Sequence, residues 1–199
     1  MTMKQLSSVT TTNLKAIHSS TSTPPTELGV VDLTATDKQQ AVAQLLKVDD
    51  PAEVTRKVTD SVLTLVPSME ARHSKDFTLL GYKVGKYEDK NICQAIRNVN
   101  RSLAGMLPKD IEKCIATILP LLTLPKDLDA TMLATKGRTL AAELAKYPAD
   151  IVMQAFEEIK KRSTFYPSFA EFYKHIEPRY LPRKYLLDAL QKCIAKKSI

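Results

Sequence analysis

Residues 147–162 read YPADIVMQAFEEIKKR, and this stretch shows the pattern that decides the fold. Pro148 marks a helix start, because proline is tolerated in the first helical turn, whose backbone N–H groups have no partner inside the helix. Apolar residues then recur on one helical face, and the run ends in three cations, which suit a helix C-terminus. These apolar residues are Ile151, Val152, Ala155, Phe156 and Ile159.

The same pattern continues in both directions along the chain. Asp50 and Pro51 form a strong start signal, a capping acid followed by proline at the first helical position. We therefore predict an all-α fold, a single bundle-like domain of about eight helices over residues 38–199, with a basic, aromatic-rich C-terminal part at 148–199. The expected helices lie at about residues 38–46, 51–66, 89–106, 108–119, 127–147, 148–162, 167–176 and 182–196.

Two segments depart from the helical pattern. Residues 1–37 contain 14 Ser and Thr and no aromatic residue, so they bury too little apolar surface to offset the entropy of ordering. We expect a disordered arm there. Residues 68–87 contain Gly81, Gly85 and a short alternating stretch, which predicts either a small hairpin or an exposed loop.

Composition excludes several classes of protein. Five glycines in 199 residues argue against β-sandwiches and against the glycine-rich phosphate loops of nucleotide-binding enzymes. No apolar run reaches the roughly 18 residues of a membrane span, and the N-terminus lacks the apolar core of a secretory signal. We therefore expect a cytoplasmic protein without membrane contact.

Residues that carry chemistry are few and scattered. Cys93, Cys114 and Cys193 each stand beside an isoleucine on an expected helix, so we interpret them as core residues. The three histidines form no close pair of metal ligands, and no serine lies in a nucleophile-elbow motif. We predict that the protein is not an enzyme and uses neither a metal nor a cofactor.

The positive charge is concentrated at the C-terminal end. Residues 151–199 contain ten Lys and Arg against five Asp and Glu, and most of the aromatic residues lie in the same stretch. Cations with interleaved rings bind phosphate backbones and bases, although an acidic protein surface would suit them equally. The predicted contact residues are Lys160, Lys161, Arg162, Tyr166, Phe169, Tyr173, Arg179, Arg183 and Lys184.

Residues 144–156 (LAKYPADIVMQAF) and 165–172 (FYPSFAEF) resemble a pattern of phage and prophage proteins. In it, a Tyr-Pro helix start and an apolar helix are followed by a basic loop and an aromatic–Pro–Ser/Thr–x–Ala–Glu helix start. The segment is similar to helical domains of phage replication proteins, including helicase loaders. Because the sequence contains no P-loop, the resemblance implies the ATPase-free type, which binds a replicative helicase.

Three functions remain open on the sequence. The first is a phage-type replication accessory protein that contacts a helicase and single-stranded DNA. The second is a phage-encoded inhibitor that binds a host nuclease or polymerase. The third is a DNA-binding regulatory or packaging protein, although no helix–turn–helix with a glycine-bearing turn stands out.

Overall fold

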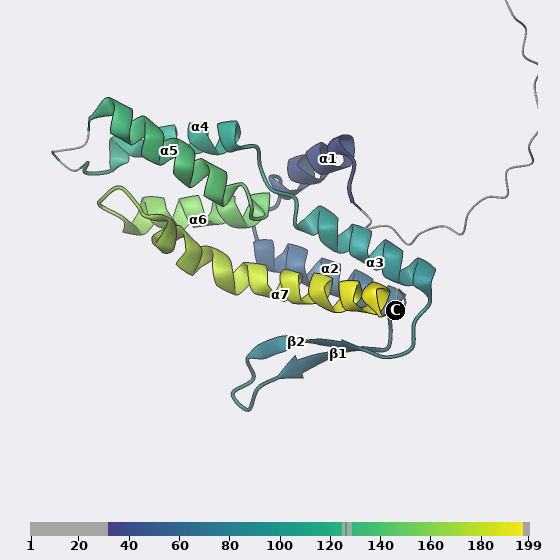
Figure 1. The fold of residues 1–199 in the computed structure, drawn as a ribbon. Helices are drawn as coiled ribbons and strands as arrows, with labels where there is room; N and C mark the ends of the chain where they lie inside the picture. Colours follow the sequence, from purple (N-terminus) through teal and green to yellow (C-terminus); the bar gives the residue numbers. More distant parts are fainter. Residues whose placement is uncertain (1–31, 125, 127–128, 197–199) are drawn as a thin grey trace, which may run out of the picture.

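The structure, a computed structural model, describes residues 32–124, 126 and 129–196. Figure 1 shows that this part of the chain is helical except for one hairpin, so the all-α prediction is confirmed at this level. Among the described residues, no helix is long and apolar enough to cross a membrane. The α-helices are α1 (Ala35–Leu45), α2 (Pro51–Leu65), α3 (Asp89–Ser102), α4 (Pro108–Ile118), α5 (Ala130–Leu144), α6 (Ala149–Arg162) and α7 (Phe169–Ala195).

Helix starts follow the expected chemistry. The Asp50 carboxylate accepts a hydrogen bond from the backbone N–H of Ala52 (2.8 Å), and Pro51 is the first residue of α2. Helix α1 is capped by Thr34 and begins at Ala35, inside the segment that we assigned to the arm. Residues 1–31 of that predicted arm lie outside the described residues.

The described residues form seven helices instead of the eight expected, because the last two are one. Helix α7 continues through Pro178 and Pro182, which the sequence analysis treated as helix boundaries. Each proline removes one backbone hydrogen bond and costs about 3 kcal/mol relative to alanine. In the turn that contains Pro178, the Arg179 guanidinium donates to the His175 carbonyl oxygen (2.8 Å).

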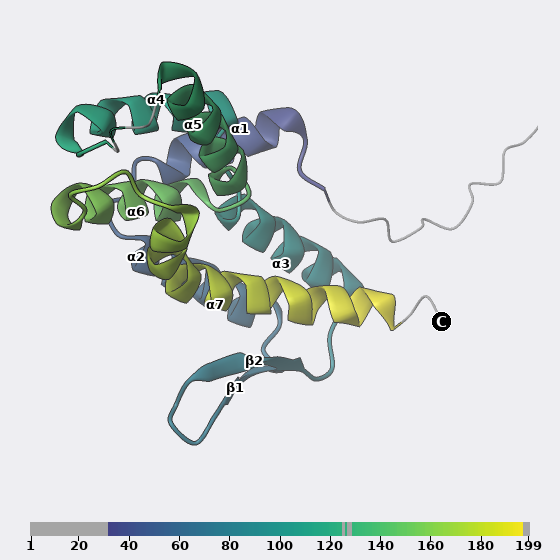
Figure 2. The ribbon, with the colours of Figure 1, turned by 60° about the vertical axis from the view of Figure 1, so that its left-hand side comes forward.

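Helix α7 stays continuous through both prolines because each of its halves packs into a different apolar cluster. We call them the first cluster, formed mainly by α1, α4, α5, α6 and the N-terminal half of α7, and the second cluster, formed by α2, α3 and the C-terminal half of α7. Phe172 and Ile176 lie in the first, and Leu186 and Leu190 lie in the second. Figures 1 and 2 show α7 passing beside α6 at its N-terminal end and beside α2 and α3 at its C-terminal end.

The segment between α2 and α3 is the hairpin, the first of the two alternatives for residues 68–87. Strands β1 (Met69–His73) and β2 (Leu79–Val84) pair antiparallel, and β2 lies against α7. The connection between α3 and α4 contains Gly105, whose backbone pairs with that of Pro148, just before α6. There the Ala149 N–H donates to the Ala104 carbonyl oxygen (3.0 Å), which brings the ends of α3 and α6 together.

Candidate partner-binding surface

The predicted cations at the end of α6 are exposed, and each is paired within its own helix. Lys160 contacts Glu157 at 3.0 Å, whereas Lys161 and Arg162 both contact Glu158, at 4.0 and 3.3 Å. Pairs of this kind at the surface contribute about 0–1 kcal/mol. The two glutamates therefore offset most of the local charge, and the run is a weaker attractor of phosphate than its sequence suggests.

The predicted aromatic residues Phe169 and Tyr173 lie together on α7, in a group of four rings that we call the aromatic surface. Tyr147, from the connection between α5 and α6, is at its centre, with ring centroids 6.2 Å from Phe169, 6.0 Å from Tyr173 and 5.1 Å from Tyr180. All four side chains are partly exposed. Such tilted and edge-on arrangements are the favoured geometries of aromatic pairs.

An apolar groove of about 420 Å³ lies beside the aromatic surface, between α5 and the start of α7. Leu140 and Pro167 line its wall together with Tyr166 and Phe169, while Lys136 and Glu143 provide charge. The Tyr166 hydroxyl is buried and has no hydrogen-bond partner among the described residues. Burial raises the pKa of this hydroxyl.

Polar groups around the rings are tied to their own helix. The Tyr173 hydroxyl donates to the Glu177 carboxylate (3.1 Å), and this bond raises the pKa of Tyr173. Arg179 is partly exposed but bonds to a backbone carbonyl of α7, as described above. Lys184 is exposed and makes no ion pair within the described part of the chain, so it remains a candidate contact.

Arg183 was predicted to contact a partner, and this prediction is wrong. Its side chain is 0% exposed, and its guanidinium points into the interior, where it forms a bidentate ion pair with buried Asp150 (2.6 and 3.1 Å). The remaining donors reach the Thr55 hydroxyl (2.9 Å) and two backbone carbonyl oxygens, of Ser102 (2.7 Å) and Pro51 (2.8 Å). All five guanidinium N–H groups are thus satisfied.

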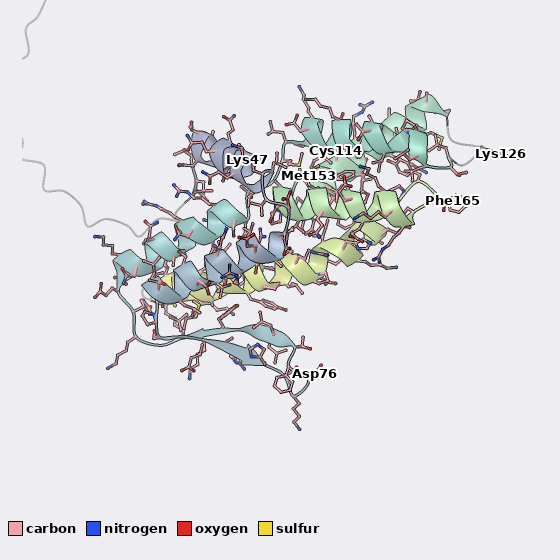
Figure 3. The ribbon with its side chains drawn as sticks, turned by 180° about the vertical axis from the view of Figure 1, so that it is seen from behind. Lys47, Asp76, Cys114, Lys126, Met153 and Phe165 are labelled. Carbon is pink, nitrogen blue, oxygen red and sulfur yellow. The ribbon has the colours of Figure 1, made fainter. Side chains whose placement is uncertain are left out.

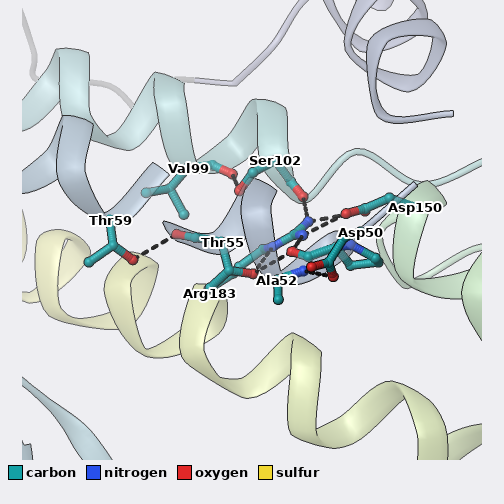
Figure 4. A network of polar contacts seen from close by, with 9 residues as sticks. Asp50, Ala52, Thr55, Thr59, Val99, Ser102, Asp150 and Arg183 are labelled. Carbon is teal, nitrogen blue, oxygen red and sulfur yellow. Dashed lines mark hydrogen bonds and ion pairs between the residues drawn. The ribbon is translucent and has the colours of Figure 1, made fainter. Parts of the chain in front are cut away.

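We call Arg183 and these partners the junction. It connects α7 to the start of α2, the end of α3 and the start of α6, between the two apolar clusters (Figure 4). The Asp150 carboxylate lies at the N-terminus of α6 and the guanidinium at the C-terminus of α3, so both charges suit the helix dipoles. A fully paired buried charge of this kind determines how the helices fit together, and it leaves nothing for an external ligand.

Phe165 and Phe172, whose helical spacing with Phe169 predicts core positions, differ in exposure. Phe172, on α7, is buried in the first cluster, whereas Phe165 is 68% exposed. Phe165 lies in the connection between α6 and α7, next to the backbone bond from Thr123 to Thr164 (2.7 Å). That connection is not helical, so the helical spacing that placed Phe165 in the core does not apply.

The cysteines only partly match the core prediction. Cys193 is buried, whereas Cys93 and Cys114 are partly exposed. Cys114 lies 3.8 Å from the Met153 sulfur, and burial raises the pKa of its thiol as it does for Cys193. Neutral thiols at neutral pH are poor nucleophiles. Within residues 32–124, 126 and 129–196, no group of three or more His, Cys, Asp or Glu is placed to hold a metal ion.

The predicted contact residues therefore separate into four groups: the paired cations of α6, the aromatic surface with its groove, the buried Arg183, and the two other cations of α7, Arg179 and Lys184. Tyr147 and Tyr180 belong to the aromatic surface and were missed. Tyr180 lies seven residues after Tyr173, a separation that places both on one face of a continuous helix. Comparisons with protein-family models, curated proteins and solved structures found no match for this chain.

Proposed function

We propose that the protein is a non-enzymatic accessory protein of phage-type DNA replication, similar in role to an ATPase-free helicase loader. It acts in the bacterial cytoplasm without a cofactor and binds a replicative helicase. The resemblance of residues 144–156 and 165–172 suggests this class of partner, and Tyr147, Tyr166 and Phe169 from these segments contribute to the surface that we assign to the contact.

The aromatic surface is the observation that carries the proposal. Aromatic side chains are enriched in protein interfaces and dominate their binding energy, whereas surfaces of isolated domains seldom gather several of them. Here four partly exposed rings adjoin an apolar groove that Tyr166 and Phe169 help to line. The arrangement suits an amphipathic helix of the helicase, with an apolar side chain in the groove.

Charge favours an acidic helix as the occupant. Lys174, next to Tyr173, and Lys184, four residues after Tyr180, are exposed on α7, and neither makes an ion pair within the described residues. The paired run Lys160–Arg162 contributes less, because Glu157 and Glu158 already neutralise two of its three charges. Rim charges of this kind mainly set the rate and selectivity of association.

Binding of a purified replicative helicase hexamer, measured by biolayer interferometry with the intact protein immobilised, tests the proposal. We expect Tyr173→Ala to weaken binding by roughly 30-fold, the effect of losing an interface hot spot worth about 2 kcal/mol. We expect Lys174→Glu with Lys184→Glu to slow association, with a smaller effect at high salt.

Lys192→Glu is the matched control, because Lys192 is exposed on α7 but lies beside the second cluster, away from the aromatic surface. Thermal melts of every variant separate lost binding from lost folding. Absence of helicase binding by the folded wild-type protein refutes the proposal. If the protein instead inhibits a nuclease or polymerase through the same residues, the inhibitor interpretation replaces it.

A further inference from the structure

The hairpin carries a second candidate surface, far from the aromatic surface. Its inner face is anchored, because Met69, Tyr82 and Val84 pack against the second cluster. Beyond these residues the two strands and their turn extend away from the helices, as Figures 1 and 2 both show. Figure 3 labels Asp76 in this turn and Phe165 in the connection before α7, well apart on the molecule.

The turn of the hairpin presents a single exposed ring. Phe77 is 86% exposed and has a φ of 61°, in the left-handed region that a bulky residue seldom adopts. The turn is fixed by its own hydrogen bonds: the Ser74 N–H donates to the Thr78 carbonyl (2.9 Å), and the Phe77 N–H donates to the Ser74 carbonyl (3.1 Å). Backbone strain held in place at an exposed site is a recognised mark of function.

The outer face and turn of the hairpin are basic. Arg72, Lys75, Lys83 and Lys86 are exposed, and none makes an ion pair within the described residues. Two acids accompany these cations: Asp76 in the turn, and Glu70, which lies directly across from Lys83 on the outer face. The Asp76 carboxylate accepts hydrogen bonds from the hydroxyls of Ser74 and Thr78, and these bonds lower the pKa of Asp76. The acid is therefore engaged in building the turn.

One position on the outer face brings the backbone within reach of a ligand. Gly81 pairs with Arg72 across the strands and has a φ of 141°, which side chains rarely allow. A β-carbon built at Gly81 would meet no atom within 4 Å, so the glycine leaves open space beside the Arg72 side chain. Lys83, two residues further along β2, lies on the same face.

We propose that this hairpin binds single-stranded DNA, with Phe77 stacked on an unpaired base and Arg72 and Lys83 in contact with phosphates. Binding of single strands combines cations along the backbone with aromatic rings on which bases stack, and both elements are present here. Ser74 and Thr78, polar groups beside Phe77, bond within the turn.

This surface shares no residue with the one assigned to the helicase, so the inference does not rest on the proposed function. An acidic protein would satisfy the cations, but it would not require an isolated ring held by a strained turn at the end of a hairpin. In duplex DNA the bases are already stacked, so a ring at this position would have to separate two of them. A single strand satisfies both features without that cost.

Fluorescence anisotropy with labelled dT20 and the intact protein tests the inference. We expect Phe77→Asn to weaken binding about tenfold, within the range for loss of one stacked base. Asparagine tolerates a positive φ, so the turn is kept while the ring is removed. We expect Arg72→Gln with Lys83→Gln to reduce the slope of log K against log salt by about 1.4, the value for two phosphate contacts on a single strand.

Phe165→Ala is the matched control for the ring and Lys109→Gln for the cations, because both residues are exposed and lie outside the hairpin. Binding of dT20 that responds to the hairpin variants and ignores these controls supports the inference. Three outcomes overturn it: the protein does not bind dT20, the control variants lose as much affinity as the hairpin variants, or binding is lost only when Lys160–Arg162 are neutralised. The inference is also overturned if the protein binds duplex DNA or rU20 more tightly than dT20. The same holds if the hairpin variants lose binding to the helicase but still bind DNA.

Discussion

The junction around Arg183 and the exposed end of α6 use the same residue chemistry in opposite ways. At the junction one arginine is fully buried and makes five hydrogen bonds that connect three other helices to α7. At the end of α6, Lys160, Lys161 and Arg162 are exposed, and each contacts only a glutamate of its own helix. The comparison teaches that a cation's place in a basic stretch says little about its role, whereas its position on the helix face says much.

Loss of the junction arginine should have the largest effect on stability. Arg183→Met leaves Asp150 buried without its partner, and we expect the free energy of unfolding to fall by about 3–5 kcal/mol. Urea denaturation followed by circular dichroism measures this. A fall of less than 1 kcal/mol would mean that water or a neighbouring group replaces the guanidinium, and the contrast with α6 would weaken.

The double variant Asp150→Asn with Arg183→Met sharpens this result. It removes both charges, so its loss should be smaller than the sum of the two single losses. Additive losses would contradict a direct ion pair between these side chains.

Two glycines extend the comparison to the backbone beside the junction. A β-carbon at Gly105 would lie 2.2 Å from the Ala145 carbonyl oxygen, whereas one at Gly137, on α5, would meet nothing within 4 Å. Gly105→Ala should therefore lower stability, by about 1–3 kcal/mol as in other overpacked sites. Gly137→Ala should raise it by about 0.5–1 kcal/mol, because alanine loses less entropy in a helix. Thermal melts of the two variants should shift in opposite directions.

Substitutions at the start of α7 should lower the free energy of unfolding by an intermediate amount that depends on pH. Ser168 and Glu171 form a capping box, and Ser168→Ala should cost about 1 kcal/mol. The bond from the Ser168 N–H lowers the pKa of Glu171 below its ordinary value of 4.5. Glu171 therefore contributes stability above that pH, and the contribution is lost as the pH falls through the folded-state pKa.

Denaturation of wild type and Glu171→Gln at pH 7 and at pH 3 checks the sign. The difference between the two proteins should be largest at neutral pH and should shrink in acid. A difference that grows in acid would contradict the capping role.

The smallest change in stability is expected from substitutions at the end of α6. Lys160→Ala removes an exposed ion pair with Glu157, and stability should change by about 0.5 kcal/mol or less. Urea denaturation in low and high salt measures it. A loss comparable with that of Arg183→Met would erase the distinction between the two regions.

Proline and glycine patterns predicted much of the fold, since Pro51, Pro108 and Pro148 do mark helix starts and Asp50 does cap α2. The error lay at Pro178 and Pro182, where local propensity predicts a break and packing of both halves of α7 overrides it. Once the helix is continuous, Arg183 falls into its buried stripe. That stripe contains Phe172, Ile176, Arg183, Leu186, Leu190 and Cys193.

The candidate site was only partly predictable for the same reason. The pattern of rings and cations in residues 151–199 identified Phe169 and Tyr173. Tyr180 lies between the two helices expected at 167–176 and 182–196, so its place on a common face with Tyr173 was not apparent. The pairing of Lys160 with Glu157 and of Arg162 with Glu158 could have been read from their spacing of three and four residues. The partner of Arg183 could not, because Asp150 lies 33 residues away and Pro51 lies 132 away.

The position of α7 after all other described elements has a consequence for how the chain acquires its structure during synthesis. Helices α1 to α6 leave the ribosome before the helix that covers both of their apolar clusters, so those clusters remain open to water until α7 emerges. The bonds of Arg183 to residues 81, 128 and 132 positions earlier then close very long loops in one late step. Ribosome-bound chains that end before α7 should therefore bind chaperones, and release of the complete helix should end that binding.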